Sequence, residues 1–141
     1  MRGEIVESIN SVTLEEAQSI ASAAEKKAEE IGQPMNIAVT EVGGRLKAFA
    51  RMEAAWTASI DIAINKAYTA AALGMATADL AEQAQPGQPL FGINTGNEGK
   101  IVIFGGGIPL MRDGHVVGAV GASGGTVDQD MEVAEAGAAA F

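Results

Sequence analysis

The uneven distribution of glycine is the feature that most constrains the fold of this 141-residue chain. Most of its 18 glycines lie between Gly87 and Gly125, so we expect the second half of the chain to be rich in strands and turns. The first half has few glycines and is expected to be mainly helical. Aromatic residues make up only 4% of the chain, so its core must reach a normal packing density through close approach of backbones. Small residues also suit tight helix contacts, within one chain or between subunits.

The length and the charge balance narrow the classes of protein that are possible. A chain of this length is predicted to form one domain, residues 1–141. Its formal net charge of −9 disfavours nucleic acid and anionic membrane surfaces as partners. Hydrophobic residues make up 48% of the chain, which is enough for a core, and no apolar run approaches the roughly 18 residues of a membrane span. The opening segment Met1–Glu7 lacks the apolar region of a signal peptide, so we predict a cytoplasmic location.

The residues available for metal or nucleophilic chemistry are few. The chain has no cysteine and one histidine, which excludes disulfides, thiolate nucleophiles and metal sites with several histidines in one chain. We therefore predict no metal site built by a single chain. No phosphate-binding glycine motif follows a strand and opens a helix, so a nucleotide site has no support.

Local signals predict the order of helices and strands. Thr13 and Glu16 fit a capping box at a helix start, as do Thr126 and Gln129 near the C-terminus. Asp113-Gly114 is the strongest hairpin signal. The predicted elements are a helix ending before Gly32, strands at 35–41 and 45–51 around Gly43-Gly44, a helix from 57 or 59 to Leu73 closed by Gly74, a short helix from Thr77 to Ala84, an irregular stretch with a short strand near 91–93, strands at 100–104, 108–112 and 115–122, and a last helix after Thr126.

Short turns between these strands predict a mainly antiparallel sheet. Helices before, between and after the strands indicate an α+β fold in which helices cover the sheet.

Two glycine-rich segments are candidate ligand contacts. The run from Gly105 to Gly107, followed by Pro109, allows a ligand or a neighbouring chain to approach the backbone, or it forms a bulge or chain reversal between strands. The run from Ser123 to Thr126 lies between a strand and a helix, where free amides bind anions. The competing interpretation is a turn into a capped helix whose dipole is already complemented by Asp128 and Asp130.

Lys66 is the most informative single residue. It is the only cation between Arg51 and Lys100, and no carboxylate lies three or four positions from it on the predicted helix. It must therefore find solvent, an acid from elsewhere in the fold, or a ligand anion. His115 follows the predicted hairpin turn directly and is interpreted as a surface residue rather than a catalytic base. Tyr68 and the six methionines are haem-ligating types, although methionine is more often core filler.

Three segments together resemble the GlcG/HbpS family, which includes the C-terminal domain of PduO-type proteins. They are residues 51–71, residues 105–110 (GGGIPL) and residues 113–130 (DGHVVGAVGASGGTVDQD), and the similarity runs from about Thr13 to the C-terminus. The resemblance implies a profilin-like, GlcG-like α+β fold with a five-stranded antiparallel sheet and helices on both faces. It also implies a homo-oligomer, from dimers to larger rings, and some members of the family bind haem. The residues shared with the family are Lys66, Thr69, Gly105, Gly106, Gly107, Pro109, Ser123, Gly124, Gly125, Thr126 and Asp130.

The leading hypothesis is a cytoplasmic, oligomeric, small-ligand-binding protein, with haem or another carboxylate-bearing molecule as its ligand. Lys66 or Arg51 would contact the carboxylate, and the pocket would lie near the second long helix and the glycine-rich turns. The alternative is an enzyme acting on a small organic substrate, with Lys66 and Asp130 as an acid–base pair and the amides of residues 123–126 as an oxyanion site. A third hypothesis is an accessory oligomer without chemistry. The expected ligand-binding residues are Arg51, Lys66, Thr69, Gly105, Gly106, Gly107, Pro109, Ser123, Gly124, Gly125 and Thr126.

Overall fold

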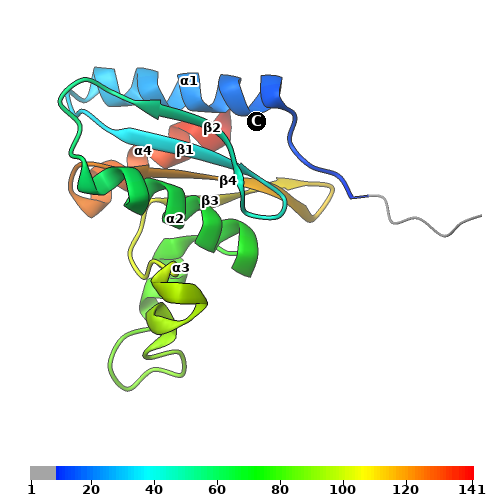
Figure 1. The fold of residues 1–141 in the computed structure, drawn as a ribbon, viewed down its shortest axis with the longest axis vertical. Coiled ribbons are helices and arrows are strands. Elements are labelled where there is room, and N and C mark those ends of the chain that lie inside the picture. The colour runs from blue at the N-terminus through cyan, green and yellow to red at the C-terminus, as the bar shows by residue number, and fades with distance from the viewer. Residues whose placement is uncertain (1–8) are drawn as a thin grey trace, which may run out of the picture.

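A four-stranded antiparallel sheet in the order β2-β1-β4-β3 organises the chain. The structure, a computed structural model, describes residues 9–141, and helices pack on both faces of the sheet (Figure 1). The elements are α1 (Leu14–Glu30), β1 (Asn36–Glu41), β2 (Leu46–Arg51), α2 (Ala58–Leu73), α3 (Thr77–Gln83), the 3₁₀ turns η1 (Ile93–Thr95) and η2 (Asn97–Gly99), β3 (Gly107–Arg112), β4 (His115–Ser123) and α4 (Val127–Ala139).

Both predicted hairpins are confirmed, and they pair with each other through β1 and β4. Asp113 and Gly114 have φ angles of 53° and 78°, the left-handed pair that a tight hairpin turn needs. Ile37 on β1 stands opposite Ala122 on β4, so segments far apart in the sequence form the centre of the sheet.

The first and last helices cover one face of the sheet side by side (Figure 1). Each begins with the predicted capping box, Thr13 with Glu16 and Thr126 with Gln129. Gly137 of α4 lies so close to α1 that a Cβ there would be 3.2 Å from Ala24 Cβ. The small residues at this position therefore serve a tight helix contact within the chain, which is one of the two uses expected for them.

The opposite face of the sheet is covered by α2, whose backbone rests almost directly on the strands. The buried alanines Ala63, Ala67 and Ala70 pack against Ala38 and Ala119. A Cβ at Gly121 would collide with the carbonyl oxygen of Ala63. This contact confirms that the core gains density by close backbone approach. Ile60 and Ile64 of α2 are only half-buried, because the buried face of this helix also includes Lys66 and Thr69.

Residues 75–104, which we call the arm, lie outside the sheet, extend beyond α2 (Figure 1) and return to α2 at Val102. Within residues 9–141 the sheet has four strands, so the expected fifth strand is wrong. The predicted strand at 100–104 does not form because its backbone bonds to α2 instead: the Val102 N–H donates to Thr69 Oγ1 at 3.0 Å. The short strand expected at 91–93 is a turn leading into η1.

Thr77 is the first residue of α3 and not its N-cap, because its hydroxyl accepts the Gly107 N–H at 2.9 Å. Among the residues that the structure describes, no helix has the length and apolar character to cross a bilayer. The expectation for Met1–Glu7 lies outside the described residues.

Candidate functional site

A buried ion pair joins α2 and α4 at the end of the sheet where β3 begins and β4 ends. Lys66 Nζ lies 2.7 Å from Asp130 Oδ2 and donates a second hydrogen bond to the Ala122 carbonyl at 3.0 Å. The side chains of Lys66 and Asp130 are 0% and 4% exposed. The Phe104 ring lies above the ammonium, with its centroid 4.7 Å from Nζ. Of the three partners open to Lys66 from sequence, the structure therefore provides an acid from elsewhere in the fold.

The predicted anion-binding amides at 123–126 are occupied by the chain's own acceptors. The Gly125 N–H donates to Asp130 Oδ1 at 3.0 Å, and the neighbouring Gly124 amide also lowers the pKa of this carboxyl. The Thr126 N–H donates to Gln129 Oε1 at 2.9 Å. Asp130 is thus the anion that this strand-to-helix turn binds, as the amides of such turns favour negative charge.

Burial shifts the pKa of both partners toward their neutral forms. It lowers the pKa of Lys66 from 10.5 and raises the pKa of Asp130 from 3.8, since each charge loses its water. The attraction between Lys66 and Asp130 opposes both shifts, and the Gly124 and Gly125 amides also hold down the pKa of the carboxyl. Because Asp130 accepts hydrogen bonds from the Lys66 ammonium and the Gly125 N–H, its surroundings complement the charged carboxylate.

The triple glycine lets the chain pass tightly over this pair. A Cβ on Gly106 would lie 2.7 Å from Lys66 Nζ, and one on Gly107 would collide with the Lys66 carbonyl oxygen. A Cβ on Gly105 would lie 2.6 Å from Met131 Sδ. The close approach that the glycines permit is therefore to their own chain. Pro109 is half-buried within β3, opposite Ala119.

The other predicted site residues are dispersed. Thr69 is buried on α2 and, besides Val102, lies 3.2 Å from the Lys100 carbonyl, so it fastens the arm to α2. Arg51 is exposed at the end of β2, two strands from Ser123, which is 4% exposed. His115 is exposed beside the β3–β4 turn, as predicted.

A surface hollow of about 580 Å³ opens between the β1–β2 turn, α2 and the arm. Tyr68 is one of the residues that line this hollow. Lys100 Nζ lies 5.9 Å from the centroid of the Tyr68 ring, and Asn97 Nδ2 donates to the Tyr68 hydroxyl at 2.8 Å. We call this depression the Tyr68 hollow. Its lining residues are Gly43, Gly44, Arg45, Leu46, Ile64, Asn65, Tyr68 and Lys100.

Sequence reasoning missed most of the Tyr68 hollow. Tyr68 was a candidate only as a haem-ligating residue type, and Arg45 and Lys100 were not candidates at all. The one available signal was the Gly43-Gly44 turn followed by a cation. Nothing in the sequence places the arm, with Lys100, beside that turn.

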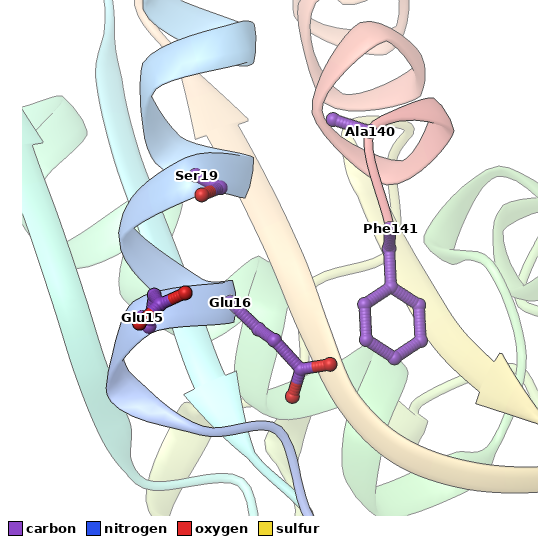
Figure 2. A pocket seen from close by; sticks show the side chains of 5 residues that line it. All are labelled: Glu15, Glu16, Ser19, Ala140 and Phe141. Carbon is purple, nitrogen blue, oxygen red and sulfur yellow. The ribbon is translucent and has the colours of Figure 1, made fainter.

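A smaller hollow of about 160 Å³ lies between the start of α1 and the C-terminal Phe141 (Figure 2). Arg112 lies over the Phe141 ring, 4.6 Å from its centroid, and bonds the Glu16 carboxylate. The Thr13 amide, and then Arg112, lower the pKa of Glu16. Arg112 and Glu16 thus bond each other here and link α1 to the β3–β4 hairpin. In the part of the chain that the structure describes, no group of three or more His, Cys, Asp or Glu side chains is placed to hold a metal ion.

Comparison with known proteins shows the family to which this chain belongs. A family model described as "Haem degrading protein HbpS-like" matches residues 12–139. A 15.0 kDa protein from the dhaT-dhaS intergenic region of Citrobacter freundii is 46% identical over 127 residues, which cover 90% of this chain and 89% of that protein. The corrinoid adenosyltransferase PduO of Citrobacter freundii is 39% identical over 93% of this chain. The chain spans only 39% of the PduO length.

Solved structures agree closely with the fold. The Klebsiella pneumoniae protein ORFY superposes with a TM-score of 0.94 at 39% identity, covering 100% of this chain and 97% of that one. The structure described as a PduOC:heme complex superposes with a TM-score of 0.89 at 35% identity, covering 93% and 95% of the two chains.

Proposed function

Because this chain belongs to the HbpS-like family, we propose that it binds a small carboxylate-bearing molecule, with haem as the first candidate, in the Tyr68 hollow. The observation that carries the proposal is that two cations, Arg45 and Lys100, line one hollow together with the Tyr68 ring in a chain of net charge −9. The haem in the PduOC complex supports haem as the ligand to test first.

The residues of the Tyr68 hollow suit the chemistry of haem. Arg45 and Lys100 offer positive charge for its two carboxylates. Leu46 and Ile64 offer apolar surface for the macrocycle, and the volume of about 580 Å³ lies in the range of small-molecule sites. Tyr68 carries the one phenol hydroxyl of the chain, a polar group that can form a hydrogen bond to a ligand. Bound haem would supply iron redox chemistry, while these side chains bind and orient it.

The residues predicted as ligand contacts have two roles in this proposal. Arg51 is exposed and lines a second hollow together with Glu25, Glu29 and Glu53, three acidic residues that disfavour a carboxylate ligand there. The buried residues, Lys66 and Thr69 among them, position α2 and the arm, which carry Tyr68 and Lys100. The glycines and the turn at 123–126 shape the same scaffold.

The enzyme alternative uses Lys66 and Asp130 as an acid–base pair, and their 2.7 Å contact is the observation in its favour. Both side chains are covered, however, and the Gly125 and Thr126 amides that would form an oxyanion site already have acceptors. We therefore rank ligand binding above catalysis.

The predicted homo-oligomer and the cytoplasmic location remain predictions. Exposed Trp56 and Phe91, at 63% and 66%, offer apolar surface for contact with another copy. Light scattering at micromolar concentration should give a mass above the 14.3 kDa of one chain, and fractionation of the host cell tests the location. A monomer mass would contradict the first prediction.

Titration with hemin tests the proposed function. We expect a saturable shift of the Soret band, and the double variant Arg45→Gln/Lys100→Gln should weaken binding by at least about tenfold, since charge-assisted contacts are lost. The control His115→Ala, in the β3–β4 hairpin and not among the residues that line the hollow, should bind as the unmodified protein does. A hemin shift that never saturates contradicts the proposal, and a loss confined to Arg51→Gln would move the site to the hollow beside Glu25.

A further inference from the structure

The hydroxyl of Tyr68 is already engaged on one side. Asn97 Nδ2 donates to the phenol oxygen at 2.8 Å, across the gap between the arm and α2. A phenol has one proton to donate and lone pairs that accept. Since Asn97 fills an accepting position, the group that Tyr68 retains for a ligand is its own O–H donor.

Two cations share the hollow with Tyr68. Lys100 Nζ is 5.9 Å from the centre of the Tyr68 ring, and Arg45 lines the same hollow. A hydroxyl donor beside two positive charges complements an anionic oxygen acceptor. A metal ion requires the opposite, an oxygen with lone pairs directed at it and no cations competing nearby.

The backbone around Asn97 is held in an unusual conformation that maintains this contact. Asn97, Glu98 and Gly99 have φ angles of 52°, 59° and 77°, three left-handed residues in succession. Such a run costs free energy for the two non-glycine residues and persists only where surrounding contacts determine it. It places the Asn97 amide on Tyr68 and Lys100 over the ring of the same residue.

We propose that Tyr68, oriented by Asn97, donates a hydrogen bond from its hydroxyl to a ligand carboxylate. The Tyr68 hollow would then recognise the carboxylate edge of a tetrapyrrole and not its metal. This inference rests on the proposed function and adds to it which part of the ligand the hollow recognises. Asn97 is a positioning residue, because it acts through Tyr68. The hollow would therefore accept metal-free porphyrins that keep their carboxylates.

Three probes separate the two modes of recognition: hemin, metal-free protoporphyrin IX, and protoporphyrin IX dimethyl ester. We expect hemin and protoporphyrin IX to bind with similar affinity and the ester at least about tenfold more weakly, because the ester has lost its charge. Tyr68→Phe keeps the ring and Asn97→Asp keeps the left-handed backbone. Each should weaken binding of both acidic porphyrins by about tenfold, the worth of a hydrogen bond to a charged group, without moving the Soret band of the hemin complex.

The matched control is Asn94→Asp, which adds the same charge at an exposed position in the arm and should change neither affinity nor spectrum. If Asn97→Asp fails to fold, Tyr68→Phe carries the test alone. Binding of hemin without protoporphyrin IX, or a Soret shift in Tyr68→Phe, overturns the inference while the proposed function stands. If no porphyrin binds the unmodified protein, both are overturned.

Discussion

Lys66 and Asp130 form a 2.7 Å ion pair although their helices cover opposite faces of the sheet. The contact passes the end of the sheet beside Ala122, whose carbonyl accepts a second bond from the Lys66 ammonium. Gly106 leaves room for it, because any side chain there would meet Nζ. One buried pair therefore joins the two helical layers, and the segment from Phe104 to Gly107 closes over it.

Lys66→Met should destabilise the protein strongly. Methionine keeps the aliphatic stem and a similar helix propensity, but Asp130 is left charged and buried without its partner. We expect the free energy of unfolding in urea to fall by about 3–5 kcal/mol. Lys26→Met, at an exposed position on α1, should change it by less than about 0.5 kcal/mol.

A second substitution identifies the cause of that loss. Adding Asp130→Asn to Lys66→Met removes the stranded charge, so the double variant should be more stable than Lys66→Met alone. Equal stability of the two would show that the stranded carboxylate is not what destabilises the single variant.

Gly107→Ala should lower the free energy of unfolding more than Gly105→Ala does. The new Cβ at Gly107 meets the backbone carbonyl of Lys66, which cannot move without lifting α2 from β3. At Gly105 it meets Cγ and Sδ of the Met131 side chain, which can change rotamer without moving the backbone. We expect about 1–3 kcal/mol or more for Gly107→Ala in thermal or urea unfolding, the range for overpacking. An equal cost for both substitutions would argue against close backbone contact between α2 and β3.

Thr69→Val should loosen the arm. Valine has the shape of threonine but cannot accept the Val102 N–H, which then lacks a partner. We expect a loss of about 1–3 kcal/mol and faster hydrogen exchange at the Val102 amide. Thr69→Ser keeps the hydroxyl and should preserve that protection. Unchanged exchange in Thr69→Val would mean that another contact holds residues 100–104.

Glu16 should make part of the stability depend on pH. Its pKa is lowered in the folded state by the Thr13 amide and by Arg112, so its contribution is complete above the unfolded value of 4.5 and is lost as the pH falls through the folded pKa. Glu16→Gln keeps the capping geometry but removes the charge, so stability between about pH 5 and pH 3 should fall less steeply than in the unmodified protein. Arg112→Gln removes one cause of the shift and should give an intermediate slope. Parallel curves for all three proteins would contradict this assignment.

Elements whose signals are local could be predicted from the sequence. The capping box of Thr13 and Glu16, the Asp113-Gly114 turn and the helix end at Gly74 each depend on φ angles and hydrogen bonds within a few residues. The small-residue composition likewise predicted backbone contacts in the core, which Gly121 and Ala63 make.

The site depended on contacts between distant segments, and only the tertiary structure determined those. Lys66 and Asp130 are 64 positions apart, so neighbouring residues could show that Lys66 lacked a partner but not which acid it would find. Residues 100–104 have the composition of a strand, yet the Thr69 hydroxyl bonds the Val102 amide and keeps this segment out of the sheet. The Tyr68 hollow combines a turn, a helix and the arm, and its charges converge only when the chain folds. Local geometry depends on interactions within short stretches of sequence. The pairing of buried charges and hydrogen-bond donors depends instead on which distant segments the fold brings within hydrogen-bond distance.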